Sequence, residues 1–353
     1  MFILVGLPVE EDGLRPTEDQ IWDEYGLRSS RILLPSFTGV SLEGIVNQVE
    51  RLGSLEKSCE GLLKTFMGYC RENRVGKGIV YGSTEEIGDF LEWDRQSFVT
   101  NSIEKAILLL DGEYRRISKA YEEKAEEFDG AKRECEKLQR LTRGSLCDID
   151  LGIIVERPEE YEFLRVLYVV VQKARVPEFN RAVDESPHIS LDAVEKVNSD
   201  EEYELFKVYV LHHGEEDVRN MIHAEGFMVK DLDKNMVSSE EMIARRRRAE
   251  EKFSAMEKIL MTFMHVHLTE VFRILIHIKL LRLFVESVYR YGLPTEYMFF
   301  VTRGEKSKVL AQWIAIAKNW PSDRIVYEEE GDNNDEGEIF FAFSEISTYG
   351  EEE

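Results

Sequence analysis

Two long helical segments constrain this chain more than any other feature of its sequence. From Ile103 to Leu141, apolar side chains recur three and four positions apart, with Glu, Lys and Arg dense between them. A second helical pattern runs from Met242 to about Tyr291. At 1.5 Å per residue, these helices would measure about 60 Å and about 75 Å, which is too long for one small domain. We therefore expect them to pack along each other.

The ends of the second helix carry recognisable signals. Ser238-Ser239-Glu240-Glu241 has a hydroxyl followed three residues later by a carboxylate, the pattern of a capping box. Gly292-Leu293-Pro294 ends the pattern, because Gly adopts the left-handed cap and Pro prevents continuation.

Between the two helices, the sequence changes to a small α/β insert over residues 151–237. Phe163–Val171 is rich in β-branched and aromatic residues and predicts a strand. The other predicted elements of the insert are strands at Tyr203–Leu211 and Phe227–Leu232 and a helix at Glu215–Ala224.

The two ends of the chain each combine strands with helices. The N-terminal part predicts strands at residues 2–6 and Arg31–Leu34 and helices at Asp19–Tyr25, Leu42–Tyr69 and Glu85–Trp93. The C-terminal part predicts strands at Tyr297–Val301, Ile325–Tyr327 and Glu338–Ile346, a helix at Lys306–Lys318 and an acidic loop at Glu328–Glu338.

This order of elements predicts a helix-rich α+β fold shaped as an elongated dumbbell. If the long helices run antiparallel, both termini share one globular foot, the helices form a neck, and the insert forms a small head. We assign 1–150 to the foot and first neck helix, 151–237 to the head, and 238–353 to the second neck helix and the remainder of the foot.

Charge and hydropathy exclude several classes of partner. The chain has 45 Lys+Arg against 69 Asp+Glu, a net charge of −24, which disfavours nucleic acid and anionic membrane surfaces. The apolar run after Met1 is short and lacks a basic leader, so we expect neither a signal peptide nor an anchor there. Ile259–Tyr291 contains many charged residues and histidines, and we expect it to be too polar to span a membrane. The four dispersed cysteines favour a reducing, cytosolic setting.

The search for catalytic, cofactor or metal motifs gives none. The Gly-rich stretch at 74–82 fails the P-loop pattern, and carboxylates are too abundant for any pair to stand out. His265 and His267 are spaced i, i+2, which points them apart on a helix, and His212-His213 precede a helix start rich in carboxylates. Arg245–Arg248 is the one strong basic run. It predicts either a dock for an acidic partner or a solvated face paired with Glu241, Glu250 and Glu251.

One segment resembles a known family. His277-Ile-Lys279-Leu-Leu-Arg282-Leu-Phe-Val-Glu286-Ser-Val-Tyr-Arg290-Tyr-Gly-Leu-Pro294 closely resembles the signature helix of the C subunit of the eukaryotic vacuolar-type (V-type) proton-translocating ATPase. Asp200–Leu211, Phe227–Asp231 and, more weakly, Glu160–Val171 resemble further segments of that family. Glu185–Ser190 and His223–Glu225 depart from its pattern.

The resemblance implies a non-catalytic stator protein without a cofactor. Its head and foot would bind E–G stalk heterodimers, its foot would also bind the cytosolic part of the membrane-sector a subunit, and actin is a further candidate partner. The protein would be cytoplasmic, peripheral on the cytosolic face of vacuolar membranes and endomembranes, would not insert into them, and would take part in reversible assembly. Two attachment points would raise the effective concentration of each contact.

Each region that we expect to bind a partner is represented here by a few of its residues. The head residues are Tyr203, Phe206, Phe227 and Lys230, the foot residues are Arg290 and Tyr291, and the basic run contributes Arg245 and Arg246. The alternative function is a coiled-coil scaffold or cytoskeletal adaptor that uses Arg245–Arg248 as its contact.

Overall fold

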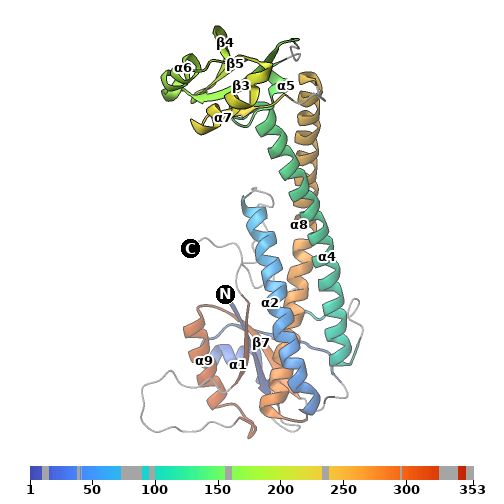
Figure 1. The fold of residues 1–353 in the computed structure, drawn as a ribbon. Coiled ribbons are helices and arrows are strands. Elements are labelled where there is room, and N and C mark those ends of the chain that lie inside the picture. The colour runs from blue at the N-terminus through green and yellow to red at the C-terminus, as the bar shows by residue number, and fades with distance from the viewer. Residues whose placement is uncertain are drawn as a thin grey trace. The chain divides into compact units, whose positions relative to one another are not determined.

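The computed structural model describes residues 1–9, 16–37, 40, 42–72, 90–94, 100–155, 161–232, 238–294, 296–325 and 341–346. Contacts divide the chain into two compact units. Unit 1 comprises Met1–Glu123 and Met261–Glu353, and unit 2 comprises Lys124–Leu260. The helix-rich α+β class is confirmed (Figure 1). The dumbbell shape and the three predicted parts stay predictions.

The two predicted long helices are present and are the longest elements of the fold. Helix α4 spans Ile103–Arg143 and helix α8 spans Ser239–Tyr291, so the division between the units falls inside both. The Glu241 amide donates to the Ser238 hydroxyl over 3.3 Å, which is the predicted hydroxyl cap. Gly292 lies in the left-handed region (φ 73°), and its amide donates to the Val288 carbonyl.

Unit 1 is built around a four-stranded antiparallel sheet that combines strands from the N-terminal and C-terminal parts of the chain. Strand β1 (Phe2–Pro8) is buried along its whole length and lies between β7 (Tyr297–Arg303) and β8 (Ala342–Ile346). Strand β2 (Ser29–Ile32) pairs with the far edge of β7. Phe2 is aligned with Arg303 on one side and with Ile346 on the other, so segments distant in sequence meet in one sheet.

The other described elements of unit 1 agree with the predictions, with one correction. Helices α1 (Glu18–Tyr25), α2 (Leu42–Glu72) and α9 (Lys306–Lys318) are present. The second strand begins at Ser29, two residues before the predicted start, because β7 pairs with residues 29–32 and Leu33 already lies outside the ladder, 65% exposed. Most of the predicted helix at Glu85–Trp93, the strand at Ile325–Tyr327 and the acidic loop lie outside the described residues.

Helix α8 supplies much of the apolar core of unit 1. One 18-residue window of this helix has a mean hydropathy of 1.5, which is long and apolar enough to cross a membrane by composition, and 44% of it is buried. The prediction that Ile259–Tyr291 is too polar to span a membrane is therefore wrong by length and composition. Buried helices of soluble proteins pass the same test. A more charged part of α8, from Val271 to Val288, which includes Arg273, Lys279, Arg282 and Glu286, is largely buried in the core of unit 1.

Unit 2 contains a second antiparallel sheet with the order β4-β5-β3-β6. These strands span Ile189–Ser199 (β4), Tyr203–Leu211 (β5), Leu164–Gln172 (β3) and Met228–Lys230 (β6). Its helices are α5 (Leu151–Ile154), α6 (Val176–Asp184) and α7 (Glu215–Ala224), with single 3-10 turns η1 (Lys173–Arg175) and η2 (His212–Gly214). Residues of α6 and α7 pack in one apolar cluster with the sheet, and Leu151 of α5 packs in another.

The prediction for unit 2 missed one strand, β4, and two helices, α6 and the four-residue α5. Strand β4 shifts register between Ile189 and Val194 and again between Lys196 and Asn198, so its apolar residues do not alternate as those of a regular strand do. Helix α6 is short, and only Phe179 and Val183 are buried on it, which left too few periodic positions to reveal it.

Candidate functional site

The segment that carries the family resemblance forms a buried ionic network in unit 1. The Lys279 ammonium donates to Glu56 over 2.5 Å and to Glu60 over 2.8 Å, and Arg282 donates to the second oxygen of Glu56 over 2.5 Å. Only 5% of the Lys279 side chain and 9% of the Glu56 side chain are exposed. Burial alone would raise the pKa of Glu56, but Lys279 and Arg282 hold it below its ordinary value.

His277 is a second buried polar group of this segment. Its Nε2 accepts the Asp94 amide over 2.9 Å, which leaves Nδ1 protonated to donate to the Arg273 carbonyl over 2.8 Å. The Trp93 ring lies 5.1 Å away, centroid to centroid. Burial lowers the pKa of His277, so the imidazole is a neutral structural group that joins two chain segments.

The four head residues named from the sequence lie mainly inside unit 2. Phe206 and Phe227 are 7% and 5% exposed and pack against Phe179, with ring centroids 5.1 Å and 5.5 Å from it. The Lys230 ammonium donates to a backbone carbonyl, and burial lowers its pKa. The Tyr203 side chain is half-buried at the edge of the smaller apolar cluster.

The remaining four named residues divide between buried and exposed positions. The Tyr291 hydroxyl donates to the Gly6 carbonyl over 3.0 Å and accepts the Ala342 amide, and burial raises its pKa to about 12. Arg246 is 5% exposed. Arg245 is exposed and pairs with Glu241, and Arg290 pairs with its helix neighbour Glu286. Most of the eight residues are therefore buried or paired within the protein and have a structural role. That the regions around them bind partners stays a prediction.

An apolar surface in unit 2 was not predicted. Phe163 is 71% exposed and Tyr161 is 45% exposed, directly before β3. The Phe163 carbonyl accepts the His212 amide, and the Tyr161 ring lies 5.8 Å from that of Tyr209. Beside them lies a groove of about 430 Å³ lined by Leu164, Pro187, His188, Ile189, Ala193, Tyr209 and Leu211. We call Tyr161, Phe163 and this groove the apolar surface. The sequence signal was Phe163, which we assigned to the predicted strand Phe163–Val171, together with Tyr161 just before it.

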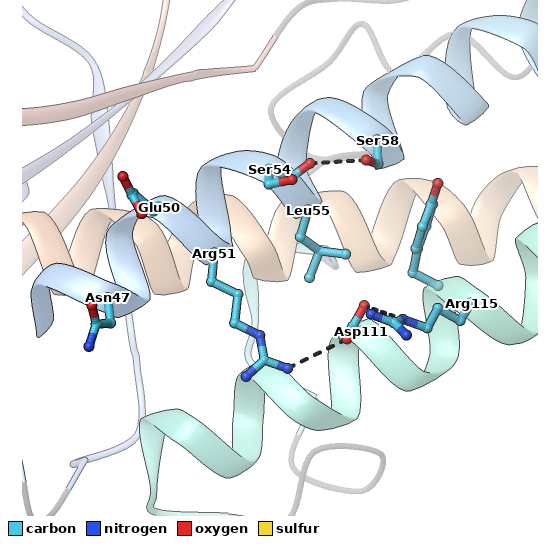
Figure 2. A pocket seen from close by; sticks show the side chains of 9 residues that line it. Asn47, Glu50, Arg51, Ser54, Leu55, Ser58, Asp111 and Arg115 are labelled. Atoms are coloured by element: carbon cyan, nitrogen blue, oxygen red, sulfur yellow. Dashed lines mark hydrogen bonds and ion pairs between the residues drawn. The ribbon is translucent and has the colours of Figure 1, made fainter. Parts of the chain in front are cut away.

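A polar groove lies between α2 and α4 in unit 1 (Figure 2). Asp111 accepts Arg115 over 2.9 Å and Arg51 over 3.5 Å, and Figure 2 shows both guanidinium groups directed toward this carboxylate. Glu50 and the hydroxyls of Ser54 and Ser58 line the same groove. Two guanidinium groups and two carboxylates line the groove, so its formal charges balance. Exposed ion pairs of this kind contribute about 0–1 kcal/mol.

Neither unit presents a constellation for metal chemistry among the residues that the structure describes. No group of three or more His, Cys, Asp or Glu side chains is placed there to hold a metal ion. The four cysteines are free thiols, and burial raises the pKa of Cys59 to about 12, which makes it a packing residue and not a nucleophile.

The described structure therefore defines a helix-rich α+β protein whose most distinctive exposed feature is an apolar surface suited to protein contacts. The family model for the V-ATPase C subunit matches residues 2–320, and the chain belongs to this family. It accordingly has the role of a peripheral subunit of the V-ATPase, a proton-transporting complex, and its partners are other subunits of that complex.

Individual relatives are similar over most of their length. A V-type proton ATPase C subunit of Caenorhabditis briggsae is 26% identical, with 80% of this chain and 78% of the relative covered. The V-type proton ATPase C subunit 1-B of Danio rerio is 23% identical, with 83% of each covered. Among solved structures, the cytoplasmic N-terminal domain of the I subunit, a homologue of the V-ATPase a subunit, is 14% identical over 90% of this chain and 98% of that one. Its TM-score of 0.31 is too low to support an argument about fold.

Proposed function

We propose that this chain is a non-catalytic stator subunit of the V-type proton pump. It links the ATP-hydrolysing sector to the membrane sector by binding E–G stalk heterodimers and the cytosolic part of the membrane-sector a subunit. It lies on the cytosolic face of vacuolar membranes and endomembranes, and it takes part in reversible assembly of the pump.

The observation that carries this proposal is the family match from residue 2 to residue 320, which spans both compact units. A tether needs at least two contact regions, and a match confined to one unit would not favour that role. Two moderate contacts on one chain hold an assembly much more tightly than either alone, because the second contact forms at a high effective concentration.

Within unit 2, the apolar surface is the best candidate for the stalk contact. Exposed aromatic side chains that flank a groove are the typical anchors of protein interfaces. Phe163 is 71% exposed in the chain alone, so a partner that covers it removes a large apolar area from water.

The test is binding of the full-length chain to purified E–G heterodimer. We expect saturable binding, weakened at least about tenfold by Phe163→Glu, because a carboxylate at an apolar anchor must be desolvated on binding. Met228→Glu is the matched control. Met228 is 44% exposed on β6, and this substitution introduces the same charge. Strand β6 forms the opposite edge of the sheet from β4, which lines the groove of the apolar surface.

The outcomes of this experiment distinguish the stator role from the scaffold or adaptor alternative. Binding that both variants retain would place the stalk contact away from the apolar surface and leave the stator role intact. Absence of any binding to the E–G heterodimer and to the membrane-sector partner would contradict the stator role and favour the scaffold or adaptor alternative.

A further inference from the structure

One serine of the chain is followed directly by proline, and it lies beside the apolar surface. The sequence has eight prolines, and only Pro187 has a Ser or Thr before it, namely Ser186. Helix α6 ends at Asp184, and the Ser-Pro pair follows in the turn that leads into β4. The pair belongs to Glu185–Ser190, the segment that departs from the family pattern, so the family resemblance gives it no role.

Ser186 lines a second groove, of about 440 Å³, that adjoins the groove of the apolar surface. Pro187 and His188 line both grooves, so Ser186 stands at the border of the proposed stalk contact. Its hydroxyl has no hydrogen-bond partner among the described residues and is not one of their buried unsatisfied groups. The hydroxyl therefore makes no bond that the described fold depends on, and it is open to solvent in the groove.

The second groove is acidic. The carboxylates of Glu185, Asp217 and Glu225 line it. The His188 Nε2 lies 3.6 Å from the Asp217 carboxylate. Among the described residues that line the two grooves, none is Lys or Arg. A negative charge added at this place would therefore meet like charges and would find no lysine or arginine to neutralise it.

We infer that Ser186 is a phosphorylation site for a proline-directed protein kinase and that its phosphate releases the stalk contact at the apolar surface. The second part rests on the proposed function, because it regulates the contact proposed there. Kinases of this class select proline after the target residue, since their binding groove offers no acceptor for an amide at that position. Proline is the one residue without an amide hydrogen, so it alone leaves no donor unpaired there.

The reaction is transfer of the γ-phosphoryl group of ATP. The Ser186 Oγ forms a bond to the γ-phosphorus while the bond from that phosphorus to the β–γ bridging oxygen breaks. ADP leaves, and the hydroxyl proton passes to the catalytic Asp of the kinase. A phosphatase reverses the change by hydrolysis, which consumes one water, restores the hydroxyl and releases inorganic phosphate.

The phosphate opposes binding at the adjoining groove for two reasons. It carries a charge of about −1.5 to −2 at pH 7, which the three carboxylates of the second groove repel. A partner that docks on the apolar surface also removes water from this anion, and an anion that loses water without gaining a partner costs free energy. The expected result is release of the partner, which suits the reversible assembly in the proposed function.

The first experiment locates the phosphate. The full-length chain is incubated with Mg²⁺, ATP and a purified mitogen-activated protein kinase, which is proline-directed. We expect mass spectrometry to find the phosphate on Ser186, and Ser186→Ala should take up none. Pro187→Ala keeps the hydroxyl and should be labelled at least about tenfold more slowly. Ser199→Ala removes an exposed serine that no proline follows and should be labelled as the parent chain is. Circular dichroism melts establish that the variants are folded.

The second experiment measures the effect on binding. The phosphorylated and the untreated chain are titrated with purified E–G heterodimer. Phosphorylation should weaken binding at least about tenfold, and phosphatase treatment should restore it. Ser186→Ala that has been exposed to the kinase should bind as the untreated parent chain does.

Two results would overturn the inference. No phosphate on Ser186, or equal labelling of Pro187→Ala, would show that the Ser-Pro pair is not the site. Unchanged or tighter binding of the phosphorylated chain would show that the phosphate does not release the contact. Absence of binding by the untreated chain would instead contradict the proposed stalk contact, and the labelling experiment would still decide whether Ser186 is a modification site.

Discussion

The cores of the two units are stabilised by different means. In unit 1, α8 buries Lys279 and His277 among apolar residues, and each of these polar groups has specific partners from distant segments. In unit 2, the larger cluster around Phe179 is apolar, and it includes the aromatic rings of Phe179, Phe206 and Phe227 from three separate segments. A buried charge tolerates few substitutions, whereas an apolar core tolerates many of similar volume.

This difference explains where the resemblance to the family is strongest. His277, Lys279 and Arg282 belong to its longest gapless segment, and the first two are almost fully buried. Such a segment identifies a fold because its buried polar residues need specific partners inside the protein. Buried residues do not by themselves identify a binding surface. The exposed Phe163 lies outside this segment.

The largest expected effect is in the apolar core of unit 2. Phe179→Ala should lower the free energy of unfolding of unit 2 by about 3–5 kcal/mol, because it leaves a cavity beneath Phe206 and Phe227. Hydrogen exchange of the β5 amides would measure it. Phe163→Ala removes the same ring from an exposed position and should change the same quantity by less than about 0.5 kcal/mol. Similar losses in both variants would contradict the burial assigned to Phe179.

The next effect is in the ionic network of unit 1. Lys279→Met should cost about 3 kcal/mol, because Glu56 stays buried with only Arg282 to neutralise it. Hydrogen exchange of the β1 amides reports the loss, and the exposed Lys57→Met is the control. Adding Glu56→Leu to Lys279→Met should recover most of the stability, since the uncompensated charge is then gone. No recovery would mean that the network is required as a unit.

The smallest effect is a pH dependence from His277. Its pKa in the folded state lies below the ordinary value of 6.5, so the unfolded state binds more protons as the pH falls. Its contribution is therefore complete above pH 6.5 and is lost progressively below it. His277→Gln should cost about 1 kcal/mol at neutral pH and should reduce this slope, measured by urea denaturation at a series of pH values. The exposed His223→Gln should keep the slope of the parent chain, and a steeper slope in His277→Gln would contradict the neutral imidazole.

The regular elements could be predicted because their signals are local. Periodic apolar residues indicated α4 and α8 almost to their ends, and the predicted bounds of β5, α7 and α9 agree with the structure. Strand β4 could not be found in this way, because its register shifts are set by pairing with β5 and not by alternation in its own sequence.

The sequence by itself determined the helix-rich class, the two long helices and the family, because each depends on spacing along the chain. Only the tertiary structure decided which side chains are buried and which are free. It placed Phe206, Phe227, Tyr291 and Arg246 inside the protein and left Phe163, Arg247 and Arg248 exposed. Burial and ion pairing depend on what neighbouring segments bring to a residue, and those neighbours lie up to hundreds of positions away, as Lys279 and Glu56 do.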